Sequence, residues 1–200
     1  MERKKIHILV LAAGSSSRLG QPKQLLPFKG TNLLTYVVQE CIESSIGNVS
    51  VVLGAHYEKL KEQIKSLDCN VLYNRNYTDG LGTSIATGVK EIVKKDSDGV
   101  INVLVDQPYF DRNILRKILA LRETKSPSII VSKYSTSSGP PVFFDKSHFE
   151  DLMALKTDIG AKEIIRNNKS IVQYIDFEKG GVDIDREEDL SILDDIPKDR

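Results

Sequence analysis

Two cations, Arg18 and Lys23, stand in a loop of small residues near the start of the chain. The loop begins with the segment 12–17 (AAGSSS), directly after the apolar run Ile8–Leu11. Small residues leave backbone N–H groups open to phosphate oxygens. The planar fork of arginine and the compact charge of lysine bind the same oxygens. The pattern therefore suits a triphosphate, although it is neither the common P-loop nor GxGxxG. Two solvated surface cations are the alternative, since Lys and Arg are mostly exposed.

Three carboxylates later in the chain could complement these cations. Asp106 directly follows the apolar run Val103–Val105, and Asp183 and Asp185 flank Ile184. A carboxylate at the end of a buried strand has a stiff support, and Mg²⁺ binds one or two such groups together with substrate phosphates. Alternate residues of an extended segment face the same side, so the two later carboxylates would point together. Asp106 could instead be a turn residue and Asp185 a helix cap. The spacing does not decide which of the two later residues is the second ligand.

The loop 74–84 (NRNYTDGLGTS) is the third candidate region, because it leads into a predicted helix. Gly80 and Gly82 permit close approach of the backbone, and Thr83 and Ser84 supply hydroxyl groups. A base or ribose could be bound there; a merely flexible loop is the alternative.

Two further groups of residues are less informative. The segment 137–141 (SSGPP) could close over a second substrate or form only a turn. The three histidines have no carboxylate or cysteine at metal-ligand spacing, so we expect them to be structural or exposed; they are His7, His56 and His148.

Apolar runs and helical periodicities alternate along the chain. Strands are expected at 6–11, 48–53, 69–73, 99–105, 128–132 and 171–177. Helices are expected at 33–41, 57–67, 84–95, 112–122, 149–155, 160–167 and 186–193, with Asn32 and Asp111 as N-caps. Prolines make 140–144 an edge strand or a strand start, and the tail 196–200 should be frayed. This order predicts an α/β fold with a mostly parallel sheet and helices on both faces. Ligands of such sheets bind at the carboxyl ends of the strands.

Composition restricts the class of protein. The chain has 200 residues, 28 Lys and Arg against 28 Asp and Glu, and hence a formal net charge of zero. We expect one domain spanning residues 1–200. Neutrality argues against nucleic-acid or anionic-membrane binding. No apolar run approaches the length of a membrane span, so we expect a cytoplasmic protein. Cys41 and Cys69 should be free thiols in a reducing compartment.

The candidate regions together resemble a known family. The segment 11–30 (LAAGSSSRLGQPKQLLPFKG) is similar to the signature LAAGxSxRMGxxKxLLPxxG of the MobA-like nucleotidyltransferases. The resemblance continues in order through VDQP (105–108), GPPVFF (139–144) and DIDREEDL (183–190), and covers nearly the whole chain. Within the family, the chain most resembles the molybdenum cofactor cytidylyltransferases. The fold implied is Rossmann-like, of the nucleotide-diphospho-sugar transferase kind.

The resemblance implies an activity and a set of site residues. The family members named transfer CMP from CTP to molybdopterin, with Mg²⁺, and release pyrophosphate. By resemblance, Arg18, Lys23 and Asp106 would be catalytic, and Asp106 and Asp185 would bind the metal. The nucleotide-binding residues implied are Leu11, Ala12, Ala13, Gly14, Lys23, Gly82, Ser84 and Asp106. The methyl group of Ala13 replaces a glycine common in guanine-using relatives, which would favour cytosine.

Departures from the family pattern concern the second substrate and the nucleotide contacts. Gly139–Pro140–Pro141 stands where Gly-x-Pro is common, and Leu81–Ile85 replaces Met-x-Ser-Ser-Leu. Two other functions remain open: a cytidylyl-, uridylyl- or guanylyltransferase acting on another phosphorylated small molecule, and a non-catalytic nucleotide-binding regulator. The resemblance allows a molybdoenzyme or its chaperone as partner, and we expect a monomer or a weak homo-oligomer.

Overall fold

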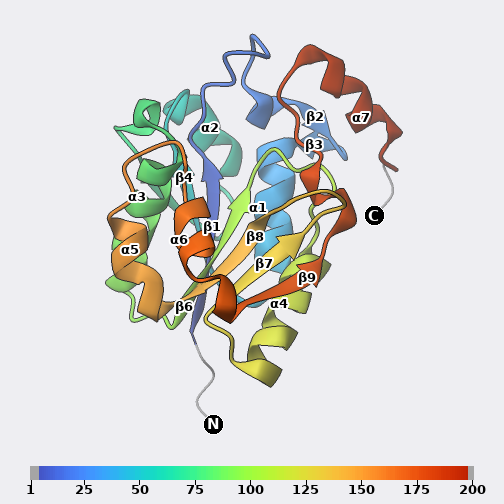
Figure 1. Ribbon diagram of the computed structural model, residues 1–200. Helices are drawn as coiled ribbons and strands as arrows, with labels where there is room; N and C mark the ends of the chain where they lie inside the picture. Colours follow the sequence, from blue (N-terminus) through green and yellow to red (C-terminus); the bar gives the residue numbers. More distant parts are fainter. Residues whose placement is uncertain (1–4, 198–200) are drawn as a thin grey trace.

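The computed structural model describes residues 5–197, which form a twisted sheet covered by helices (Figure 1). The seven-stranded sheet has the order β5-β4-β1-β6-β8-β7-β9. All neighbouring pairs are parallel except the two pairs made by β8, so the prediction of a mostly parallel sheet is confirmed. The strands are β1 (Ile6–Ala12), β4 (Gly47–Leu53), β5 (Asn70–Tyr73), β6 (Gly99–Leu104), β7 (Ile129–Lys133), β8 (Ser138–Asp145) and β9 (Val172–Asp176). A separate hairpin joins β2 (Pro27–Phe28) to β3 (Thr31–Asn32).

Apolar residues on both sides of β1 explain why helices cover both faces of the sheet. Every residue of β1 is buried, as expected for a central parallel strand. Ile8 and Val10 belong to the apolar cluster that includes α1 (Leu33–Glu43), α2 (Tyr57–Ile64) and α4 (Arg112–Lys125). Leu9 and Leu11 belong to the cluster on the other face, with α3 (Leu81–Val93), α5 (Phe149–Met153) and α6 (Lys162–Asn167). The predicted helices on both faces are therefore confirmed.

Both predicted N-caps are present. The side chain of Asn32 accepts a hydrogen bond from the backbone N–H of Thr35 at 2.9 Å. The side chain of Asp111 accepts from Asn113 N at 2.9 Å and from Ile114 N at 3.3 Å. These caps satisfy backbone donors that the helices themselves leave free.

Helix α3 begins at Leu81, three residues before the predicted start, so the prediction of loop structure up to residue 83 was wrong. The first backbone donors of the helix are satisfied by a segment far along the chain: Gly82 N donates to Thr157 O at 2.9 Å, and Leu81 N to Asp158 Oδ1 at 3.4 Å. A search for local capping residues cannot detect such a partner.

Strand β8 is central, so the prediction of an edge strand for 140–144 was wrong on that point. The prolines are tolerated because the register with β7 shifts between Val131 and Ser132, which pair with Val142 and Gly139. Pro140 and Pro141 fall within this shift, and pairing with β6 starts only at Val142. Neither proline therefore occupies a position where the sheet requires a backbone N–H donor.

The end of the described chain is more ordered than expected. A 3₁₀ turn (Glu187–Asp189) leads into α7 (Leu190–Asp195), and Ile196 is buried in the core. The predicted fraying is therefore wrong for Ile196, because its side chain has an apolar site to occupy. Pro197 is exposed, and the last three residues of the predicted tail, 198–200, lie outside the described residues. Within the described chain, no helix is both long and apolar enough to cross a membrane.

Candidate active site

The loop after β1 is held open by a buried glutamine. Gln24 is fully buried, and its Nε2 donates to Ala12 O at 3.0 Å and to Gly14 O at 2.8 Å. Ser16 Oγ accepts from the backbone N–H of Lys23 at 3.0 Å. The backbone N–H groups of residues 14–18 donate no hydrogen bond to any described residue. The loop therefore keeps its N–H groups available for an anion.

Lys23 lies between two carboxylates. Its Nζ is 2.6 Å from Asp106 Oδ2 and 2.6 Å from Asp185 Oδ1, although Lys23 and Asp185 are 162 residues apart in sequence. The side chains of Lys23 and Asp106 are 12% and 18% exposed, whereas that of Asp185 is 49% exposed. The structure thus brings together three of the predicted site residues.

The electrostatics of this centre are strongly coupled. Burial alone would lower the pKa of Lys23, but the charges and hydrogen bonds of Asp106 and Asp185 outweigh it and raise that pKa. Partial burial, followed by repulsion from Asp106 and Asp185, raises the pKa of Asp183 to about 6. Asp183 is exposed by surface area, yet it lies in a cleft where protein atoms surround it. The centre therefore concentrates more negative charge than one ammonium group can neutralise.

Backbone and apolar contacts hold these side chains in place. Asp106 follows the end of β6, and its backbone carbonyl accepts from Ile184 N at 3.0 Å. Ile184 is fully buried and packs with Leu19 and Leu26 of the loop after β1. The alternative reading of Asp185 as a helix cap is wrong, because the N-cap of the following turn is Arg186.

The same centre has the chemistry of a divalent-cation site that needs a phosphate to complete it. Asp106 Oδ1 is buried and has no hydrogen-bond partner in the described structure. Two carboxylates with substrate phosphates and waters are a usual environment for Mg²⁺. Within residues 5–197, no group of three or more His, Cys, Asp or Glu side chains is placed to hold a metal by itself.

Of three other predicted site residues, Gly82 and Ser84 make hydrogen bonds elsewhere, and Arg18 makes none with described residues. Arg18 is exposed and has no hydrogen bond or ion pair with described residues. Gly82 N donates to Thr157 O, and Ser84 Oγ accepts from Asn74 Nδ2 at 3.0 Å. No described contact joins these residues to Lys23.

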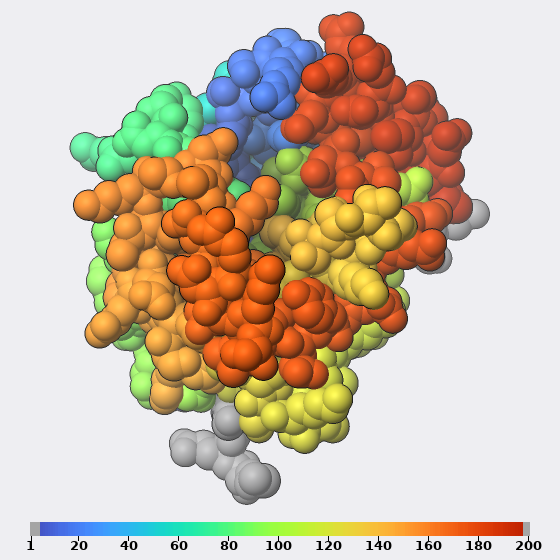
Figure 2. Space-filling model, in the orientation of Figure 1, coloured from blue at the N-terminus to red at the C-terminus, as the bar shows by residue number. Residues whose placement is uncertain are grey.

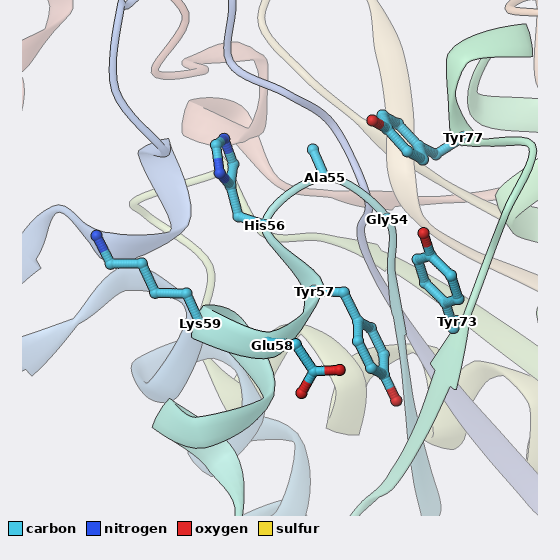
Figure 3. Close-up of a pocket in the computed structure, with 8 residues that line it drawn as sticks. All are labelled: Gly54, Ala55, His56, Tyr57, Glu58, Lys59, Tyr73 and Tyr77. Carbon is cyan, nitrogen blue, oxygen red and sulfur yellow. The ribbon is translucent and has the colours of Figure 1, made fainter.

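A pocket lined by three tyrosines lies at the carboxyl end of β4 (Figure 3). Its volume is about 510 Å³, and the rings of Tyr57 and Tyr73 are 4.6 Å apart between centroids. Gly54 allows close packing with Tyr77, because a Cβ atom there would lie 2.5 Å from the Cβ of that residue. The backbone N–H after Gly54 donates to Ala13 O at 3.0 Å, which ties this pocket to the loop after β1.

A second cavity, of about 340 Å³, begins next to the carboxylates and extends over the sheet. Its floor comes from β1, β6 and β8, its walls from α3 and α6, and its mouth from residues 137–140 and 181–183. Figure 2 shows a hollow between the loop after β1 (blue), the segment around α6 (orange) and the chain after β9 (red). The lining is mostly apolar; it includes Leu11, Leu81, Ile85, Leu104, Val142, Phe144, Ile159 and Ile165.

Sequence reasoning missed three side chains that shape the site: Gln24, Asn102 and Gln107. Gln107 Nε2 donates to Tyr134 Oη, Pro140 O and Gly180 O at 2.9, 3.0 and 2.6 Å, and so joins the segments around the cavity mouth. A detectable signal existed for Asn102, since it is the one polar residue inside the apolar run 100–105.

Comparison with known proteins finds a family match and several relatives. Residues 8–172 match the MobA-like NTP transferase domain. The chain is 30% identical over 169 residues to the purine catabolism protein PucB of Bacillus subtilis, covering 80% of each. It is 25% identical over 194 residues to nicotine blue oxidoreductase of Paenarthrobacter nicotinovorans (91% of this chain, 93% of that one). It is 25% identical over 142 residues to the molybdenum cofactor cytidylyltransferase of Escherichia coli (70% of each).

Solved structures show the same architecture. The crystal structure of Rv0371c from Mycobacterium tuberculosis has a TM-score of 0.83 and 25% identity, covering 96% of this chain and 98% of that one. Its complex with manganese has a TM-score of 0.80 and 23% identity, covering 96% of this chain and all of that one. The α/β fold and the match over residues 8–172 make this chain a member of the MobA-like NTP transferase family.

Proposed function

We propose that the protein transfers CMP from CTP to the phosphate of a molybdopterin-type acceptor and releases pyrophosphate. One observation carries this proposal: the ammonium group of Lys23 sits between Asp106 and Asp185, beside a loop with free backbone N–H groups. The loop supplies donors for a triphosphate, and the neighbouring cavity, lined by Asp183, has room for a second substrate. Similarity to a molybdenum cofactor cytidylyltransferase supports the choice of acceptor.

In the proposed reaction, an oxygen of the acceptor phosphate attacks the α-phosphorus of CTP. A new P–O bond forms there, and the bond from the α-phosphorus to the bridging oxygen breaks, so pyrophosphate leaves with the electron pair. An ionised phosphate needs no general base. The protein's role is to position the groups and neutralise charge. Lys23 and Arg18 would contact the leaving pyrophosphate.

We further propose that Asp106 and Asp185 hold Mg²⁺ when the nucleotide is bound. The support is the buried, unpartnered Oδ1 of Asp106 together with the carboxylate of Asp185. The ion would supply charge neutralisation on the phosphates. Lys23 would then leave its place between the carboxylates and turn to the phosphates. A manganese complex of a structural neighbour agrees with use of a divalent ion.

We propose that the methyl group of Ala13 favours cytosine. Ala13 is only 7% exposed and packs in the apolar cluster beside α3, so little of it could touch a base. We likewise propose contacts of a nucleotide with Gly82 and Ser84, on the basis of the residue types in the loop and of the resemblance. We also propose that residues 1–200 form a single domain.

Release of pyrophosphate from CTP, measured with Mg²⁺ and molybdopterin, tests the proposal. Acceptor-dependent release of one pyrophosphate per CMP transferred is the expected result. GTP should be used less well than CTP; equal or better use of GTP contradicts the base choice. Release with a different phosphorylated acceptor would assign the alternative transferase function. CTP binding without any release would indicate a nucleotide-binding regulator.

A further inference from the structure

Asn102 lies in the floor of the 340 Å³ cavity, and its side chain makes no hydrogen bond with any described residue. It lies in the middle of β6, opposite Leu9 of β1 and Val142 of β8. The residue is 3% exposed, and its Oδ1 is fully covered and unpartnered in the described structure. Asparagine is unfavourable in a buried strand flanked by apolar residues. Folding alone therefore does not explain its presence.

A second buried asparagine shows what a structural role looks like in this chain. Asn74 is also 3% exposed, but its Nδ2 donates to Thr83 Oγ1 at 2.9 Å and to Ser84 Oγ at 3.0 Å. Its Oδ1 accepts from Asn76 N at 3.0 Å. Both ends of that carboxamide are satisfied, whereas neither end of Asn102 has a described partner.

Gln107, on the same cavity wall, differs from Asn102 because its orientation is fixed. Pro140 O and Gly180 O are carbonyls that only accept, so the amide nitrogen of Gln107 must lie on their side. No bond fixes Asn102 in this way, so its carboxamide can turn to donate or to accept. It can pair with a ligand edge that carries hydrogen-bond donors, acceptors or both.

We propose that Asn102 is a specificity-determining residue that hydrogen-bonds the ring edge of a flat nitrogen heterocycle on the acceptor substrate. The apolar walls from α3, α6 and β8 would cover the two faces of the ring, and the reacting phosphate would point toward the carboxylates at the cavity mouth. A carbocyclic ring would leave Asn102 unpartnered and bind less well. This inference rests on the proposed function, because it assigns the cavity to the acceptor.

Binding of two small probes to the full-length protein tests the inference without any turnover. Pterin-6-carboxylate and 2-naphthoate are bicyclic aromatic carboxylates, and only the pterin carries ring N–H donors and acceptors. Calorimetric titration should show that the wild-type protein binds the pterin tenfold to a hundredfold more tightly, the effect expected of a satisfied buried hydrogen bond. Asn102→Leu should lose this preference and bind both probes alike.

Two controls separate recognition from folding. Asn48→Leu makes the same chemical change at an exposed position of β4, away from the cavity, and should keep the wild-type preference. Asn102→Val suits a buried strand and should reproduce the Asn102→Leu result if that variant folds poorly; thermal unfolding reports on both. A preference retained by folded Asn102 variants overturns the inference.

Absence of any preference in the wild-type protein also overturns it, as does failure to bind either probe. Failure of the proposed function gives a result different from failure of this inference. The pterin preference would still depend on Asn102, but no pyrophosphate would be released from CTP with molybdopterin.

Discussion

Replacement of Lys23 by methionine should increase the affinity of the free protein for a divalent cation while removing transfer activity. In the structure, the ammonium group lies between the two carboxylates that are proposed to hold the metal. Each carboxylate oxygen is 2.6 Å from the same nitrogen, so the two are at most twice that distance, 5.2 Å, apart. A Mg²⁺ ion with oxygen ligands at about 2.1 Å spans about 4.2 Å, so a small closure of the carboxylates would accommodate it. A metal must therefore displace Lys23 before it can bind.

The size of the effect follows from what the ion must displace. A hydrogen bond between charged groups contributes about 1.5–3 kcal/mol. The contact with Asp106 is mostly buried and falls in this range, whereas the contact with Asp185, 49% exposed, adds little because solvent screens it. Since about 1.4 kcal/mol corresponds to a factor of ten, the variant should bind metal roughly tenfold to a hundredfold more tightly.

Titration with Mn²⁺, followed by the EPR signal of the free ion, measures this affinity in the absence of nucleotide. Lys117→Met makes the same change at an exposed lysine of α4 and should leave the affinity unchanged. Adding Asp106→Asn to the Lys23 variant should reverse the gain. An unchanged Mn²⁺ affinity in Lys23→Met would refute the assignment of these carboxylates to a metal.

Three further outcomes follow from buried groups. Burial lowers the pKa of His7 from 6.5 to about 4, so the unfolded chain binds a proton first as pH falls; His7 should therefore contribute a loss of about 3 kcal/mol of stability between pH 6.5 and 4. The raised pKa of Asp183 acts in the opposite direction in this range, so urea unfolding should show the loss as a difference between the wild-type protein and His7→Gln, and the exposed-residue control His56→Gln should behave as the wild type. Gln24→Ala should cost about 1–3 kcal/mol and raise the KM for CTP more than it lowers kcat, because two loop carbonyls lose their donor. Gly82→Ala would place a Cβ atom 2.5 Å from Thr157 O, so thermal unfolding should show a loss of about 1–3 kcal/mol; an unchanged midpoint contradicts the close packing.

Local patterns were sufficient for the elements but not for their long-range partners. The period of apolar residues and the caps at Asn32 and Asp111 correctly predicted strands and helices, because those signals depend on neighbours in sequence. The start of α3 was missed because its donors are satisfied by Thr157 and Asp158. The central place of β8 was missed because a register shift leaves its two prolines outside the hydrogen-bonded pairs. The first error arises because a distant segment supplies the hydrogen-bond acceptors, and the second because local rules do not predict a register shift between two paired strands.

The candidate site was predictable to a similar extent. Lys23 and Asp106 were expected near each other, since the carboxyl ends of parallel strands converge, and Asp183 or Asp185 was expected as a partner of Asp106 across a shared cation. The structure places Asp106 and Asp185 in contact with Lys23. The direct insertion of the ammonium group between the carboxylates was not expected. It depends on how the buried Gln24 holds the loop, and that contact involves backbone carbonyls, which carry no sequence signal.

The residue spacing left open whether Asp183 or Asp185 is the second metal ligand, and the positions of the two side chains favour one of them. Both flank the buried Ile184, but Asp185 contacts Lys23, whereas Asp183 lines the cavity proposed for the acceptor. Repulsion from Asp106 and Asp185 adds to burial in raising the pKa of Asp183 to about 6. Carboxylates crowded around a single ammonium group oppose folding more than they support it, and such clusters are concentrated at functional sites. We therefore propose Asp185 as the second metal ligand and Asp183 as a contact of the acceptor.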